Sequence, residues 1–338
     1  MTGDARQHFH ALITAIKMFL AGLIGFILVN YFHLPEGVWC LVTIAAITQV
    51  GLQQTLAKSL MRAIGTITGA IAGYAIAVFA KGDPAIIIAL IFTMIFVTSY
   101  IALQPTIYSY AGIVTGMTMA IVVFFSLAHQ NFYSIAVDRT IEVLLGIIVL
   151  AIINFFLFFL VKKFFPNNIK KATLSWQLPQ FKFNANYVIS ALKVASACVF
   201  TFLIWYYCKQ PEGYWATITC LLIMEENQHG TFKKGFFRFF SHLVATILGL
   251  ICVLALLHLP YTWRLIPLLI TFFACGFLIG SENQYASMGN TLGIAVAIML
   301  LTTPDAHDTL HIIFARFYNV MIGVVVAFSV LFFKWRRV

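Results

Sequence analysis

Charged side chains are scarce in this chain: only 9% of its 338 residues are Asp, Glu, Lys or Arg. A soluble globule needs a charged surface, and an apolar content of 62% with a mean hydropathy of +0.95 leaves too little material for one. We therefore expect lipid to solvate the chain. The formal charge of +10 does not indicate a nucleic-acid partner, because the basic residues lie between apolar spans, where membrane orientation explains them.

Motifs of catalysis and cofactor binding are missing as well. The six cysteines are scattered through apolar spans without a Cys-x-x-Cys pair, so we expect neither a disulfide nor a metal site. No GxxxxGK[ST] phosphate loop, GxSxG elbow or HExxH helix occurs. The sequence thus predicts no enzyme and no cofactor, and any transport would draw its energy from a gradient or a partner.

One pattern occurs twice. The stretch from Ala11 to Tyr74 recurs without a gap from Tyr187 to Leu250, and the register later slips by one residue. Apolar bias alone does not align prolines, tryptophans, lysines and arginines at one offset, so we infer an internal duplication. Residues at the same place in the two copies are called counterparts below. The pairs include Lys17/Lys193, Pro35/Pro211, Glu36/Glu212, Gly37/Gly213, Trp39/Trp215, Arg62/Arg238, Gly112/Gly289 and Arg139/Arg316.

The apolar segments predict an all-α integral membrane protein with about twelve transmembrane helices. Each copy holds six segments, and because six is even, the copies form parallel repeats. The predicted domains are a first repeat over 1–165, a cytoplasmic linker over 166–185 and a second repeat over 186–338. The segments are 10–32, 37–51, 57–80, 84–103, 108–128, 139–161, 186–208, 213–225, 233–257, 262–280, 285–302 and 309–333.

The basic residues gather on one predicted side of the membrane. Cytoplasmic loops carry the excess of Lys and Arg, so both termini are expected to be cytoplasmic. The residues on that side are Arg6, Lys58, Arg62, Lys162, Lys163, Lys170, Lys171, Lys182, Lys233, Lys234, Arg238, Lys334, Arg336 and Arg337.

Segments 37–51 and 213–225 are too short to cross a bilayer comfortably, since thirteen to fifteen helical residues span roughly 20 Å. Short segments at matching places in two halves indicate a transport site. Trp39 and Trp215 follow their Pro-Glu-Gly turns and have two interpretations: stacking on an aromatic solute, or anchoring a helix end at the membrane interface. Elsewhere, Gly65 and Gly69 begin a stripe of small residues that predicts close helix packing.

Four cations lie within or near apolar helices. Lys17 and Lys193 stand about two turns inside, where an ammonium costs at least about 2.5 kcal/mol. They would either line an electropositive cavity for an organic anion or snorkel to the cytoplasmic headgroups. Arg62 and Arg238 sit one turn into their segments, where they would bind substrate or contact lipid phosphates.

Two further arginines and two glutamates complete the candidates. Arg139 and Arg316 open the last segment of each copy, either guarding an exit or serving a structural role. Glu142 lies one turn after Arg139, so an ion pair is the default and proton coupling the alternative. Glu226 directly follows segment 213–225 and is either a solvated turn residue or a proton or substrate gate.

The motif Pro-Glu-Gly-x-Trp-x-x-x-Thr occurs at Pro35 and again at Pro211, and Arg62 opens the small-residue stripe that follows. This pattern resembles the fusaric acid resistance protein family, which includes bacterial aromatic acid exporters and is similar to plant aluminium-activated malate transporters. The resemblance implies a bacterial inner-membrane transporter that exports organic, often aromatic, carboxylates, sometimes with a periplasmic adaptor. Larger members carry a cytoplasmic domain between their halves, which this chain replaces with a short linker.

We therefore expect a gradient-driven exporter whose substrate anion collects between the repeats. The substrate-binding candidates are Lys17, Lys193, Arg62, Arg238, Trp39, Trp215, Arg139 and Arg316, and the proton-coupling candidates are Glu142 and Glu226. A passive anion channel and a non-transporting assembly protein are the alternatives. The expected partners are membrane lipid, a small organic anion, a periplasmic adaptor and further copies of the chain.

Overall fold

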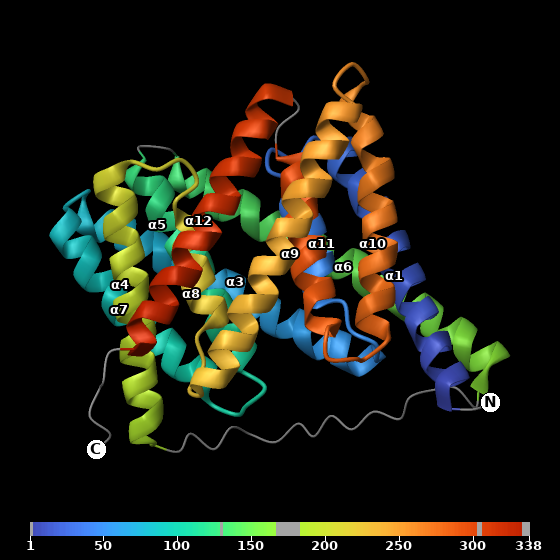
Figure 1. The fold of residues 1–338 in the computed structure, drawn as a ribbon, viewed down its shortest axis with the longest axis horizontal. Coiled ribbons are helices and arrows are strands. Elements are labelled where there is room, and N and C mark those ends of the chain that lie inside the picture. The colour runs from blue at the N-terminus through green and yellow to red at the C-terminus, as the bar shows by residue number, and fades with distance from the viewer. Residues whose placement is uncertain (1–2, 129–130, 167–182, 303–305, 333–338) are drawn as a thin grey trace. The chain divides into compact units, whose positions relative to one another are not determined.

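The structure is a computed structural model that describes residues 3–128, 131–166, 183–302 and 306–332. These residues form α-helices and no strand (Figure 1). The predicted linker over 166–185 lies largely outside the described residues. The helices are α1 (Gly3–Tyr31), α2 (Val38–Ile47), α3 (Leu52–Ala80), α4 (Pro84–Leu103), α5 (Ser109–Leu127), α6 (Phe132–Phe164), α7 (Ala185–Cys208), α8 (Tyr214–Ile223), α9 (Gln228–Ala255), α10 (Leu265–Gly280), α11 (Ala286–Leu301) and α12 (Ala306–Phe332), with a 3-10 turn η2 (Tyr261–Arg264).

Nine of the described helices are long and apolar enough to cross a membrane. The prediction of an all-helical, multi-pass membrane protein is confirmed, whereas the prediction of about twelve spans is not. The three shorter apolar helices are α2 and α8, with 10 residues each, and α11, with 16. At about 1.5 Å per residue, α2 and α8 reach only about 15 Å, half of a hydrocarbon layer.

Both short helices begin directly after a Pro-Glu-Gly turn because the glycine lets the chain pack against the preceding helix. A Cβ on Gly213 would lie 2.2 Å from Cδ1 of Trp205, and one on Gly37 would lie 1.9 Å from Cγ1 of Val29. Both helices end where the backbone turns extended, at Thr48 and its counterpart Met224.

The chain divides into two compact units, and each unit contains segments from both sequence copies. α3, α6, α9 and α12 each contribute one part to each unit. The sequence copies and the compact units are therefore different divisions of the same chain. Unit 1 comprises Met1–Leu60, Ile141–Ser175 and Phe240–Ile313; unit 2 comprises Met61–Thr140, Trp176–Phe239 and Phe314–Val338.

In unit 1, α1 packs along α10, and α2 packs against α11 (Figure 1). Glycines bring α10 to the backbone of α1: a Cβ on Gly276 would lie 2.7 Å from Cα of Ala15, and one on Gly280 would lie 2.4 Å from Cα of Ala11. This helix pair joins a helix of the first copy to a helix of the second.

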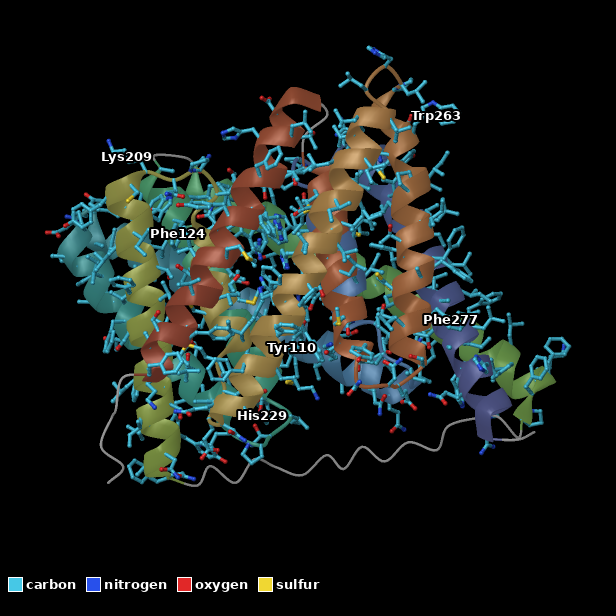
Figure 2. The ribbon with its side chains drawn as sticks, in the orientation of Figure 1. Tyr110, Phe124, Lys209, His229, Trp263 and Phe277 are labelled. Carbon is cyan, nitrogen blue, oxygen red and sulfur yellow. The ribbon has the colours of Figure 1, made fainter. Side chains whose placement is uncertain are left out.

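Unit 2 repeats this arrangement with counterpart helices, α7 along α4 and α8 against α5. An aromatic cluster fills its core, in which the ring centroids of Phe124 and Trp205 are 4.5 Å apart (Figure 2). The small-residue stripe of α3 packs on α5, because a Cβ on Gly69 would lie 2.6 Å from the Thr115 carbonyl oxygen. The sequence-based interpretation of the stripe as a packing surface agrees with this contact.

Candidate functional site

The start of α8 in unit 2 holds two aromatic rings in a fixed position. One carboxylate oxygen of Glu212, Oε2, accepts hydrogen bonds from Nε1 of Trp215 at 2.9 Å and from the hydroxyl of Tyr214 at 2.7 Å. The two ring centroids are 5.1 Å apart. The Pro-Glu-Gly motif therefore supplies both the helix start and the acceptor that orients the rings.

Arg316 of α12 lies flat on this aromatic pair. The central carbon of its guanidinium is 3.4 Å from the ring centroid of Trp215, and the side chain is fully buried. Its three nitrogens Nε, Nη1 and Nη2 have no hydrogen-bond partner among the described residues. Stacking uses the face of the guanidinium and leaves the N–H groups at its edge pointing sideways.

Arg238 of α9 reaches the same helix one turn further along. Its Nε donates to Oγ1 of Thr219 at 3.1 Å, and the Thr219 hydroxyl donates to the carbonyl oxygen of Trp215 at 2.7 Å. Three predicted site residues, Trp215, Arg316 and Arg238, thus gather along α8 within unit 2. Two of them are cations, so the buried surroundings of this part of α8 are cationic and aromatic.

A polar side chain of α12 forms a hydrogen bond with the turn that precedes α8. Nδ2 of Asn319 donates to the carbonyl oxygen of Pro211 at 2.8 Å. Glu212 has a φ of 58°, a left-handed conformation that non-glycine residues adopt at a cost. The bond from Asn319 helps to hold the backbone in this conformation, which directs the Glu212 carboxylate at the rings.

In unit 1 the counterpart turn has a related but inverted arrangement. Nε1 of Trp39 donates to Oε2 of Glu36 at 2.8 Å, as in the other copy. Oε1 of the fully buried Glu142, the counterpart of Asn319, accepts from the backbone N–H of Glu36 at 2.8 Å. The two copies thus use opposite sides of the same peptide group. In unit 1 the carboxylate of Glu142 accepts from the N–H of the Pro35–Glu36 peptide, whereas in unit 2 the amide of Asn319 donates to the C=O of the Pro211–Glu212 peptide.

Lys17 binds the end of α2 within unit 1. Its Nζ donates to the carbonyl oxygen of Gln49 at 2.6 Å and lies 3.5 Å from that of Val50, and the side chain is 2% exposed. Both carbonyls follow the C-cap residue Thr48, so the ammonium lies close to the carboxyl end of α2, where a cation interacts favourably with the helix dipole. This geometry supplies a structural reason for the buried ammonium.

The predicted cations outside the start of α8 are divided between the two units. Nη1 of the buried Arg62 lies 3.4 Å from the hydroxyl of Tyr110 in unit 2. Lys193 of α7 is half-buried, and Arg139 of α6 is buried with 1% exposure. Lys17 belongs to unit 1 and the other three to unit 2, so no single unit holds all the predicted cations.

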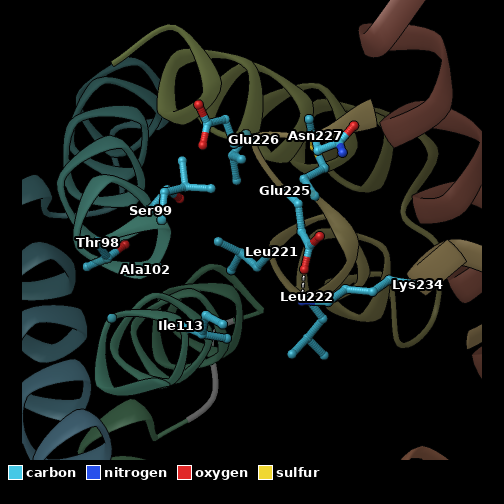
Figure 3. A pocket seen from close by; sticks show the side chains of 14 residues that line it. Thr98, Ser99, Ala102, Ile113, Leu221, Leu222, Glu225, Glu226, Asn227 and Lys234 are labelled. Carbon is cyan, nitrogen blue, oxygen red and sulfur yellow. Dashed lines mark ion pairs between the residues drawn. The ribbon is translucent and has the colours of Figure 1, made fainter. Parts of the chain in front are cut away.

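Unit 2 also contains a cavity of about 290 Å³ at the end of α8 (Figure 3). Glu226, a predicted coupling residue, is exposed at this cavity, and the neighbouring Glu225 forms an ion pair of 2.5 Å with Lys234. The figure shows Ser99 and Thr98 of α4 on the side opposite Glu225 and Lys234. The complete lining is Thr98, Ser99, Ala102, Leu103, Gly112, Ile113, Val194, Leu221, Leu222, Met224, Glu225, Glu226, Asn227 and Lys234.

Several residues of these sites were not predicted as site residues. Glu212 was recognised only as part of a turn motif, and Tyr214 and Ser99 were not singled out. Tyr214 and Ser99 depart from their counterparts Val38 and Gly276, whereas Glu212 binds the rings of residues two and three positions further on. A comparison of the two copies for broken symmetry would have found Ser99, whose counterpart is Gly276.

Comparison with known proteins gives one family. The family model described as fusaric acid resistance protein-like matches residues 20–153 and 197–330, two regions that together cover most of the chain. The second match begins and ends 177 residues after the first, which agrees in offset with the inferred duplication. No curated protein and no solved structure matches the chain.

Proposed function

Because the chain belongs to the fusaric acid resistance protein-like family of membrane transport proteins, we propose that it exports small organic carboxylate anions, aromatic acids among them. The family match and the nine apolar helices support a membrane transporter. The substrate class rests on the chemistry of the surface along α8.

The guanidinium of Arg316 carries this proposal, because its three nitrogens are buried and have no hydrogen-bond acceptor among the described residues. A charge that is buried without a partner is costly, and the cost falls when an opposite charge binds. A carboxylate fits best, because its two oxygens match two parallel N–H groups at the edge of a guanidinium. Trp215 occupies the face of Arg316, so the anion approaches in the plane of the guanidinium.

The neighbouring rings favour substrates with an aromatic part. Tyr214 is half-buried beside Trp215, and both rings are held by Glu212. An aromatic acid bound to Arg316 would place its ring against these side chains at the offset or edge-to-face geometries that aromatic pairs prefer. Arg238 adds a second positive charge one turn along α8, which extends the attraction for an anion into the helix bundle.

A proton gradient is the proposed source of energy. The sequence contains no phosphate-binding loop, and Glu142 is the one fully buried acidic residue among those whose side chains the structure describes. A carboxyl group inside a membrane protein is a typical proton relay. Glu226, exposed at the cavity of unit 2, is the second candidate for this role.

Transport of radiolabelled benzoate into inverted membrane vesicles that contain the full chain tests the proposal. A hydrogen bond to a charged group contributes about 1.5–3 kcal/mol, so we expect Arg316→Gln to lower uptake about ten- to hundredfold. Arg316→Lys keeps the positive charge but loses the planar pair of N–H donors. Its uptake should lie between that of the unchanged protein and that of Arg316→Gln. Lys209→Gln, at an exposed residue, is the matched control and should leave uptake unchanged.

Three outcomes would contradict the proposal. Normal benzoate uptake by a well-folded Arg316→Gln variant would exclude the proposed site. Flux that persists after the proton gradient is collapsed and follows the benzoate gradient alone would indicate a passive channel. No flux across a panel of aromatic and aliphatic carboxylates would favour a membrane assembly protein.

A further inference from the structure

The two short helices end in different surroundings, although their sequences are counterparts. In unit 1, side chains bring N–H donors to the end of α2. Lys17 reaches the carbonyl oxygen of Gln49, and Nδ2 of Asn290 donates to the carbonyl oxygens of Ala45 at 2.6 Å and Thr48 at 3.3 Å. An ammonium and an amide thus cover the negative end of this helix.

In unit 2 the counterparts of Lys17 and Asn290 do not place N–H donors at the end of α8. The counterpart of Asn290 is Ile113, whose side chain has no N–H group and lines the cavity. The counterpart of Lys17 is Lys193, which is half-buried and is not among the lining residues. The cavity therefore lies at the place in unit 2 where unit 1 holds an ammonium and an amide.

The sequence explains why this place stays open. In unit 1, Gly276 and Gly280 let the backbone of α10 touch that of α1. Their counterparts on α4 are Ser99 and Leu103, which both line the cavity. Side chains at these positions exclude the close backbone contact of unit 1, because a Cβ on Gly276 or Gly280 would lie within 2.7 Å of α1 backbone atoms.

The walls of the cavity favour a positive ligand. Glu225 is neutralised by Lys234, which leaves the carboxylate of Glu226 and the carbonyl end of α8 as net negative groups. Ser99 gives a second, independent indication. Ser99 is one of the residues that line the cavity (Figure 3), its side chain is 4% exposed, and its Oγ has no hydrogen-bond partner among the described residues.

We propose that this cavity binds a small organic ammonium ion. The ammonium group would take the place that Lys17 and Asn290 fill in unit 1, donating to the end of α8 and to Ser99 and facing Glu226. The hydrocarbon part would contact the apolar lining, which includes Ile113 and Leu221. This site goes beyond the proposed function, because it takes a cation and lies at the opposite end of α8 from Arg316.

An inorganic cation fits the cavity less well. A volume of about 290 Å³ is far larger than a single metal ion needs, and much of the wall is apolar. Metal ions such as calcium need several oxygen ligands close together. The side chains that the structure describes contain no cluster of three or more His, Cys, Asp or Glu residues suited to a metal ion.

Isothermal titration calorimetry on the full chain in lipid nanodiscs tests the site, with 2-phenylethylammonium chloride as the probe. We expect saturable binding that Ile113→Asn weakens at least tenfold, because the new amide would cover the end of α8 as Asn290 covers the end of α2. Glu226→Gln should weaken binding about tenfold and Ser99→Ala several-fold. Thr93→Ala, at an exposed position on α4, is the matched control and should bind the probe normally.

Comparison ligands make the result decisive. Equal binding of neutral 2-phenylethanol would show an apolar cavity without charge recognition and would overturn the proposal. Competition by sodium chloride at equal concentration would indicate an inorganic cation site and would also overturn it. Binding of benzoate that the same variants weaken would identify an anion site instead. Probe binding that none of the three folded variants changes would exclude this cavity.

Discussion

Lys17 and Lys193 show how one residue type acquires two environments. The sequence established that both ammonium groups stand inside apolar helices at counterpart positions. The structure buries Lys17 against the carbonyl oxygen of Gln49 and leaves Lys193 half-buried. Sequence patterns give the cost of placing a charge in a helix, but the partner that offsets this cost comes from another part of the fold.

Replacing Lys17 by Met should destabilise the protein by about 1–3 kcal/mol, because the carbonyl of Gln49 loses its charged donor and keeps the hydroxyl of Thr55 at 3.2 Å. Thermal unfolding of the purified protein in detergent measures the change. Lys193→Met is the matched control, and its effect should be smaller. If Lys17→Met left the unfolding temperature unchanged but abolished benzoate uptake, Lys17 would be a substrate ligand and not a helix cap.

A substitution at Glu142 can distinguish a structural role of this side chain from a role in proton transfer. Its Oε1 accepts from the backbone N–H of Glu36, and a glutamine at this position keeps an oxygen that accepts the same bond. Glu142→Gln should therefore preserve folding while removing the titratable group. We expect benzoate uptake driven by a pH gradient to fall at least tenfold, and benzoate exchange without a gradient to continue.

A variant that retains gradient-driven uptake would show that Glu142 carries no proton. Glu226→Gln, measured in the same vesicles, then tests the second coupling candidate. A loss of uptake and exchange together would indicate that the Glu142 variant is damaged as a whole, and its gel-filtration profile would distinguish this outcome.

At the scale of elements, the helix pairs α1–α10 and α7–α4 differ in how closely they approach. Small residues four positions apart allow two helix backbones to touch. Gly276 and Gly280 of α10 allow this contact with the backbone of α1. Ser99 and Leu103 stand at the counterpart positions on α4. The same helix arrangement thus gives a closely packed pair in one unit and room for a cavity beside the other pair.

Gly276→Ser should destabilise unit 1 by about 1–3 kcal/mol, since its Cβ would lie 2.7 Å from Cα of Ala15 and from the carbonyl oxygen of Thr14. The reciprocal change Ser99→Gly should cost no more than about 1 kcal/mol, the usual penalty of glycine within a helix. Unfolding temperatures of the two purified variants give the comparison. Equal effects of both changes would show that the glycine contact does not control the packing.

At the scale of the whole molecule, each compact unit is assembled from both halves of the sequence. In unit 1, α1 and α2 of the first copy pack with α10 and α11 of the second, and unit 2 pairs α4 and α5 with α7 and α8. Neither half of the chain contains a complete unit. The predicted boundaries at 165 and 186 mark the copies in the sequence. Expression of the two halves as separate chains tests how far each half is stable alone.

Residues 1–165 and 186–338, expressed together as separate chains, should copurify in detergent because the α1–α10 and α4–α7 contacts join them. Each half expressed alone should aggregate or be degraded, since it leaves the partner faces of these helices uncovered. Pull-down of one tagged half followed by gel filtration measures the association. Two monodisperse halves that do not associate would contradict this prediction and support independent repeats.

The sequence alone determined that the chain is an all-helical membrane protein, where its two short helices begin, and which family it resembles. These properties follow from apolar content and from proline and glycine positions, which act locally along the chain. The tertiary structure decided that Arg316 stacks on Trp215, that Lys17 binds the carbonyl of Gln49 just after α2 and that Ser99 lines a cavity. These features depend on side chains that meet from distant segments, and the periodicity of a single segment contains no information about such partners.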